Sequence, residues 1–151
     1  MQSLKQEYGR VAAVLASPLT EGIALLIVRL ALAGVFWRSG RTKVVEGSWL
    51  EISDTTRFLF ESEYAGVPLP AAWAAPMATY AEHLFPVLLV LGLATRFSAL
   101  ALLGMTLVIQ FFVYSEAWWS VHLLWVALAA MLISRGGGLL SLDRAIAGRQ
   151  R

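Results

Sequence analysis

The sequence of 151 residues contains no cysteine. That absence excludes disulfide bonds, thiolate metal ligands, iron–sulfur clusters and thiol–disulfide exchange. Charged residues are also scarce, since they make up 15% of the chain, against about 25% in typical soluble domains. The formal net charge is only +2, so the chain lacks the basic surface by which nucleic-acid-binding domains hold phosphates.

Hydrophobic residues, in contrast, make up 58% of the chain, and the mean hydropathy is +0.67. A domain of this size cannot bury so much apolar surface in a water-soluble fold. Disordered chains have the opposite composition. These values predict an all-α integral membrane protein whose main partner is the lipid bilayer.

Four stretches are apolar and long enough to cross a bilayer whose hydrocarbon core is about 30 Å thick. They cover residues 18–37, 71–94, 97–114 and 118–134. They predict a four-helix bundle that forms a single membrane domain over residues 1–151. The first stretch is expected to stay in the mature protein, because it follows a polar arm and carries Arg29 at its centre.

The segment 38–70 is the one sizeable loop between the predicted spans. Within it, Asp54 can cap a short helix over about residues 55–64, and Gly66 and Pro68 would end that helix. Phe58 and Phe60 give the helix an apolar side. Two placements are open: a lid over the mouth of the bundle, or a surface helix in the lipid headgroup layer.

Loop charges predict the orientation in the membrane. With four spans, both termini lie on one side together with the turn at Arg96, and this side has seven basic and three acidic residues, a net charge of +4. The opposite side has four basic and six acidic residues, a net charge of −2. The positive-inside rule therefore predicts cytoplasmic termini in a bacterial inner membrane. The seven basic residues are Lys5, Arg10, Arg96, Arg135, Arg144, Arg149 and Arg151.

Two ionisable residues lie deep inside the predicted spans. Arg29 and Glu82 each stand eleven residues into a span, which places both about 16 Å from a membrane face. We expect a buried ion pair between them, because an isolated charge at this depth is costly. Such a pair could serve a proton path, or it could simply fix the helix register.

A second polar group is predicted in the outer half of the bundle. Gln110 and His122 stand about 6–8 Å inside the outer boundary on consecutive spans, so their side chains can meet. Trp118 and Trp125 share the helical face of His122. His83 shares a face with Glu82 in the second span. These residues predict an outward-facing ligand pocket.

Metal and haem sites are disfavoured because the two histidines lie at different depths in the membrane. His83 lies about 18 Å and His122 about 7 Å from the outer boundary, whereas paired axial haem ligands need nearly equal depth. A transition-metal site that combines these histidines with Glu82 has the same difficulty. We therefore expect no metal site.

The sequence resembles the DoxX family of small four-helix membrane proteins. The resemblance rests on motifs in this order: Arg29, Ser39-Gly40, Gly66-Val67-Pro68, Glu82, Leu91–Arg96, His122 and Gly137–Asp143. It implies a four-helix membrane fold and points to no single activity, because the relatives are of several kinds. Some relatives are subunits of a thiosulfate:quinone oxidoreductase, others are associated with oxidative-stress defence, and others are encoded beside iron enzymes that modify copper-binding peptides.

Three functions remain open on this basis. The first is a redox accessory that binds a quinone-like lipid, in which Gln110 and His122 donate hydrogen bonds to the quinone oxygens and an indole stacks on the ring. The second is a small transporter that uses Arg29 and Glu82. The third is a scaffold that docks a soluble protein partner, or a homo-oligomer. A stand-alone enzyme is disfavoured, because the sequence carries no nucleophile, metal or nucleotide motif.

Overall fold

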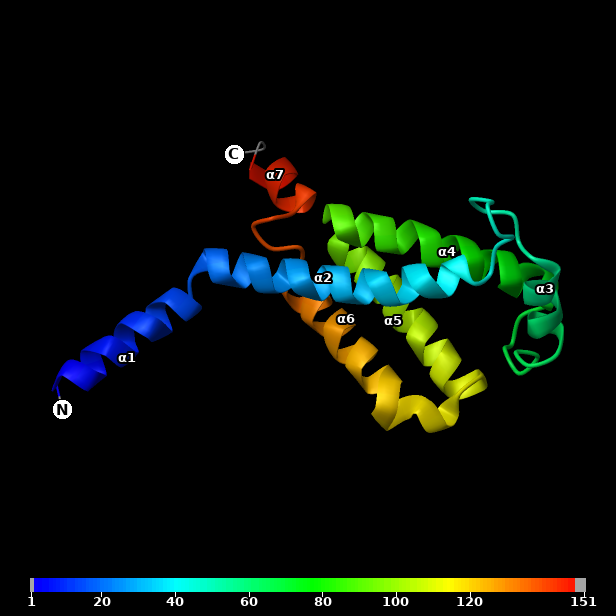
Figure 1. Ribbon diagram of the computed structural model, residues 1–151, viewed down its shortest axis with the longest axis horizontal. Helices are drawn as coiled ribbons and strands as arrows, with labels where there is room; N and C mark the ends of the chain where they lie inside the picture. The colour runs from blue at the N-terminus through cyan, green and yellow to red at the C-terminus, as the bar shows by residue number, and fades with distance from the viewer. Residues whose placement is uncertain (1, 149–151) are drawn as a thin grey trace.

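The computed structural model describes residues 2–148, which form helices joined by short loops (Figure 1). The helices are α1 (Gln2–Leu15), α2 (Pro18–Arg41), α3 (Asp54–Glu61), α4 (Ala71–Leu91), α5 (Thr95–Phe112), α6 (Leu123–Arg135) and α7 (Leu142–Gly148). A 3₁₀ turn at Ser115–Ala117 and a π-helical turn at Trp118–His122 lead into α6. The predicted all-α class is confirmed.

Four of these segments are long and apolar enough to span a bilayer: α2, α4, α5 and Ser115–Arg135. The four predicted spans are therefore confirmed, with shifted ends. The first span continues to Arg41 instead of residue 37, and the second ends at Leu91 because Gly92 adopts φ +67° and caps it. Left-handed glycines commonly end helices in this way.

The bundle core lies where α2, α4, α5 and α6 meet. Its fully buried residues are Leu25, Leu32, Ala33, Phe36, Leu89, Ala99, Leu102, Ala129 and Leu132. On α2, the buried positions recur at helical spacing, and the opposite side exposes Leu19, Ile23, Ile27 and Leu30. An apolar exposed side is expected for a helix whose surroundings are lipid.

The helix α3 packs against α4 at one end of the long axis (Figure 1). Ser53, and not Asp54 as predicted, is its N-cap: the Ser53 hydroxyl accepts a hydrogen bond from the Thr56 backbone N–H at 3.2 Å. Phe60 joins Ala74 and Ala75 in a small apolar cluster. The Thr56 hydroxyl donates to the Lys43 carbonyl at 2.9 Å and fixes α3 to the end of α2.

The helices α1 and α7 lie toward the opposite end of the long axis from α3 (Figure 1). This arrangement puts both described chain ends on the side that the charge pattern assigns to the cytoplasm. Arg149 and Arg151, two of the basic residues behind that assignment, lie outside the described residues.

We expect a reporter fused after Arg151 to be active only if it functions in the cytoplasm, because basic loops are retained there. Paired alkaline phosphatase and fluorescent-protein fusions measure this. High phosphatase activity at the C-terminus would overturn the orientation. A second fusion within the loop 45–51 should give the opposite pattern and serves as the control.

Candidate functional site

The predicted Arg29–Glu82 ion pair is wrong. Glu82 pairs instead with Lys43, whose Nζ lies 2.6 Å from Glu82 Oε2. Arg29 donates from Nη1 to the carbonyl of Gly137 at 3.0 Å. Both Arg29 and Glu82 are buried, at 1% and 2% exposure, so each charge is held inside protein as predicted, but by a different partner.

Arg29 and Glu82 are far apart because α2 and α4 are shifted relative to each other along the bundle axis. Glu82 and His83 lie beside Gly40, near the outer end of α2, because a Cβ on Gly40 would be 3.1 Å from Glu82 Cβ. Arg29 lies beside Gly92, directly after the inner end of α4. Ten residues of helix separate Glu82 from Gly92, so the two charges stand about 15 Å apart along the bundle. The prediction assumed that α2 and α4 begin at opposite membrane faces, at the residues where the apolar stretches begin, so that equal counts meet at the middle of the bilayer.

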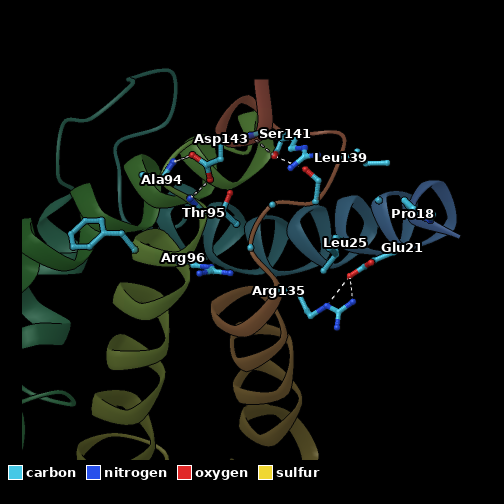
Figure 2. A pocket seen from close by; sticks show the side chains of 16 residues that line it. Pro18, Glu21, Leu25, Ala94, Thr95, Arg96, Arg135, Leu139, Ser141 and Asp143 are labelled. Atoms are coloured by element: carbon cyan, nitrogen blue, oxygen red, sulfur yellow. Dashed lines mark hydrogen bonds and ion pairs between the residues drawn. The ribbon is translucent and has the colours of Figure 1, made fainter. Parts of the chain in front are cut away.

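Arg29 belongs to a group of contacts that we name the inner clasp: Arg29, the α4–α5 turn at 92–95 and the segment 137–143. Asp143 accepts hydrogen bonds from the backbone N–H groups of Ala94, at 2.7 Å, and Thr95, at 2.9 Å, and so caps α5 (Figure 2). The Asp143 N–H donates to the Gly92 carbonyl at 2.9 Å. A carboxylate at a helix N-terminus satisfies free N–H groups and is favoured by the helix dipole.

Glycine is required in the inner clasp by close packing. A Cβ on Gly137 would lie 2.6 Å from Ser141 Cβ and 2.7 Å from Thr95 Oγ1. Gly92 adopts a positive φ, and a Cβ there would overlap Arg29 Nη1. Two motifs far apart in the sequence, Leu91–Arg96 and Gly137–Asp143, therefore fold against each other and surround Arg29.

The half of the bundle toward α3, which the charge pattern assigns to the outer side, contains a cavity of about 400 Å³, which we name the outer cavity. It lies between α4 and α5 and is closed by α2, α3 and α6. Most of its lining is apolar, and the residues are Ser39, Lys43, Phe60, Tyr64, Val67, Leu69, Ala74, Met77, Ala78, Ala81, Glu82, Phe85, Ala101, Met105, Val108, Ile109, Val113, Tyr114, His122 and Trp125. Phe60 of α3 and Tyr64, just after α3, line the cavity. Of the two placements expected for this helix, a lid or a surface helix, the contacts therefore favour the lid, and we call the segment 54–64 the lid.

Lys43 offers little hydrogen-bonding capacity to a ligand. Its ammonium donates to Glu82 Oε2 at 2.6 Å, to Ser39 Oγ at 3.0 Å and to the Ser39 carbonyl at 3.4 Å. A lysine ammonium has three N–H groups, so all three are used. Glu82 keeps further lone pairs on its carboxylate and remains an acceptor at the cavity wall.

Gln110 and His122 do meet, and the contact defines the imidazole tautomer. Gln110 Nε2 donates to the carbonyl of Ser115 at 2.7 Å, which turns Gln110 Oε1 toward His122 Nδ1, also at 2.7 Å. An amide oxygen only accepts, so Nδ1 must carry the proton. When the ring is neutral, Nε2 is then unprotonated and is a hydrogen-bond acceptor on a residue that lines the outer cavity.

The remaining predicted ligand residues lie in different places. Trp125 lines the outer cavity, and its ring centroid is 5.1 Å from that of His122. Among the residues that the structure describes, Trp118 and His83 are outside the cavity lining. His83 instead donates through Nδ1 to the Thr79 carbonyl at 2.7 Å and packs edge-on against Trp37. Gln110 orients His122, donates one amide N–H to Ser115 and, among the described residues, lies outside the cavity lining, so it is not placed to donate to a ligand there.

Tyr114, in the loop between α5 and α6, connects this loop to Glu63 and Tyr64 at the end of the lid. The Tyr114 hydroxyl donates to Glu63 Oε1 at 2.5 Å and lies 3.3 Å from the Tyr64 hydroxyl. The hydrogen bond to Glu63, with a smaller contribution from Tyr64, raises the pKa of Tyr114 above its usual value. Tyr114 therefore stays protonated and keeps donating throughout the neutral pH range.

Sequence reasoning missed Lys43, Phe60 and Tyr64 as parts of this site. Lys43 had a usable signal, because it follows Phe36 by seven residues and so continues the buried face of α2. For Phe60 and Tyr64 the sequence predicted the helix but not the surface that it covers. Within residues 2–148, the structure contains no group of three histidine or acidic side chains that could hold a metal ion.

The fold and these two sites define a small four-helix integral membrane protein with an apolar outer cavity and a buried arginine clasp. Comparison with known proteins gives the family. The family model DoxX matches residues 24–115, and an uncharacterized protein of Haemophilus influenzae is 36% identical over 141 residues, covering 83% of this chain and 84% of the relative. The chain belongs to the DoxX family. No solved structure matches.

Proposed function

We propose that the outer cavity binds the head group of a quinone-class lipid, and that the protein is an accessory of membrane redox chemistry in a bacterial inner membrane. The observation that carries the proposal is an apolar, aromatic-walled cavity with polar groups at only a few points. This composition is typical of sites for small amphipathic ligands. Met77 and Val108, which line the cavity, are also exposed on α4 and α5, so an isoprenoid tail can leave between these helices into lipid.

Two polar groups of the lining, His122 and Glu82, accept hydrogen bonds, while the lining hydroxyls contact other protein groups: Tyr114 donates to Glu63, Tyr64 lies against Tyr114, and Ser39 holds Lys43. His122 presents Nε2 because Gln110 occupies Nδ1, and Glu82 is a carboxylate. Lys43, which is the one lysine or arginine in the lining among residues 2–148, has used its three N–H groups. A quinone carbonyl would find no free donor at these residues, whereas the two hydroxyls of a hydroquinone could donate to His122 and Glu82. The proposed ligand is therefore the reduced form.

We expect the purified protein to bind a short-chain hydroquinone more tightly than the matching quinone. Replacing His122 with leucine keeps the helix apolar and removes one acceptor, which should weaken hydroquinone binding by about 0.5–1.5 kcal/mol, or up to about tenfold. Isothermal titration calorimetry in detergent measures the hydroquinone affinity in the presence of a reductant and the quinone affinity in a separate titration without it. Trp118→Phe is the matched control, because Trp118 lies outside the cavity lining.

Two results would count against the proposal. Equal affinity for the quinone and the hydroquinone would contradict the assignment of His122 and Glu82 as hydrogen-bond acceptors for the ligand. It would still agree with ligand binding in the outer cavity. Absence of saturable binding to either form would reject the quinone function itself. The second outcome would favour a scaffold that docks a soluble partner, since the 15 Å separation of Arg29 and Glu82 removes the charge pair on which a transporter was based.

A further inference from the structure

A second cavity, of about 640 Å³, lies beside the inner clasp, at the far end of the bundle from the outer cavity. We name it the inner cavity. Its walls come from the first turns of α2 and α5, the last turn of α6, and the glycine-rich segment that follows α6 (Figure 2). Three arginines, Arg96, Arg135 and Arg144, line it together with the two acids Glu21 and Asp143.

Both acids are already engaged by groups of the protein. Arg135 binds Glu21 through Nε, at 2.7 Å, and through Nη2 (Figure 2). Asp143 is held by the two N–H groups at the start of α5. Arg96 donates from Nη2 only to the Ser134 carbonyl, at 3.1 Å. Among residues 2–148, Arg96 and Arg144 have no carboxylate at ion-pair distance, and the three arginines and two acids leave the cavity lining with a net charge of +1.

One residue of the cavity lining has a buried hydroxyl without a partner. Thr95 lines the cavity and is 0% exposed, and its Oγ1 has no hydrogen-bond partner within the described chain. Buried hydroxyls are nearly always hydrogen-bonded. An unsatisfied hydroxyl beside two free guanidinium groups fits a ligand that brings acceptor oxygens.

The lining also has apolar side chains, some of which are exposed at the surface of the fold. Leu25 of α2, Phe97 of α5 and Leu139 of the glycine-rich segment line the cavity, and Phe97 is 64% exposed. A ligand that satisfies both kinds of wall carries an anionic head and an acyl chain. Basic pockets between membrane helices on the cytoplasmic side bind anionic lipid head groups in this way.

We propose that the inner cavity binds an anionic phospholipid, with its phosphate between Arg96 and Arg144 and an acyl chain along Leu25 and Phe97. Each arginine adds about fivefold in affinity when it lies near an anionic lipid. The site is independent of the outer cavity and does not depend on the quinone proposal.

Native mass spectrometry of the full chain in detergent tests this proposal with phosphatidylglycerol and phosphatidylcholine of the same acyl chains. We expect phosphatidylglycerol to be retained preferentially. The Arg96→Gln and Arg144→Gln substitutions should each reduce the preference about fivefold. Arg57→Gln, an exposed arginine of α3 at the other end of the bundle, should leave the preference unchanged.

A competition arm with water-soluble glycerophosphoglycerol separates a lipid from a free phosphate ester. Weak competition by this head group supports a phospholipid, because the acyl chain then contributes to binding. Competition at the same concentration as the lipid would overturn the lipid assignment in favour of a soluble phosphate ester. Equal retention of the two lipids, or an unchanged preference in the double variant, would overturn the site.

Discussion

Replacing Gly92 with alanine is expected to abolish most of the folded protein. Gly92 adopts φ +67°, and its added Cβ would overlap Arg29 Nη1 and lie 2.5 Å from Ser141 Cβ. A left-handed alanine costs about 1–2 kcal/mol, and overpacking a close contact costs about 1–3 kcal/mol. The sum, about 2–5 kcal/mol, is a large part of the stability of a small protein. Fluorescence-detected size-exclusion chromatography after graded heating measures the loss.

Gly104→Ala provides the matched control. Gly104 lies within α5, and a Cβ there would meet nothing within 4 Å, so alanine should be neutral or slightly stabilising through its helix propensity. Normal yield and melting temperature for Gly92→Ala would mean that Arg29 and Ser141 do not pack against this turn. The inner clasp would then be incorrect.

Removing Lys43 is expected to be almost as damaging as a cavity in the core. Lys43→Met leaves the Glu82 carboxylate buried without its cation, and breaking one side of a buried ion pair costs about 3–5 kcal/mol in soluble cores. Glu82→Gln leaves the Lys43 ammonium without its anion and should also lower the folded yield. The double variant should recover part of the loss, because both charges leave together. Thermal unfolding of the four proteins gives the coupling energy.

A parallel cycle with Arg29→Leu is the control. Arg29 and Glu82 stand about 15 Å apart along the bundle, and substitutions that far apart usually add within about 0.5 kcal/mol. Strong coupling between Arg29 and Glu82, together with additivity between Lys43 and Glu82, would contradict the charge pairing described above.

The arrangement of four spans could be read from composition and hydropathy, because a bilayer accepts few alternatives to apolar helices. The ends of the spans could not. Gly92 ends α4 through a left-handed turn that the sequence shows only as one glycine, and the polar Arg38 and Arg41 lie inside α2. A helix ends where individual residues cap it, whereas hydropathy is averaged over many residues and so does not show the exact end.

The candidate site was predicted in part. Gln110 and His122 were expected to meet because they lie on consecutive spans joined by a short loop, which holds their depths nearly equal. Arg29 and Glu82 lie on spans separated by a loop of more than twenty residues, from Thr42 to Pro70. Such a loop allows α4 to slide along α2, so equal counts from the span ends did not give equal depth.

Lipid analysis of the gently purified protein tests the central claim, the binding of a quinone-class lipid in the outer cavity, most directly. Extraction followed by quantitative mass spectrometry should give a co-purified quinone-class lipid in near-stoichiometric amount. Ala81→Trp, which fills the cavity from α4, should lose that lipid, whereas Ala127→Phe on the exposed side of α6 should retain it. Equal amounts in all three proteins, or none in the unmodified protein, would contradict the account.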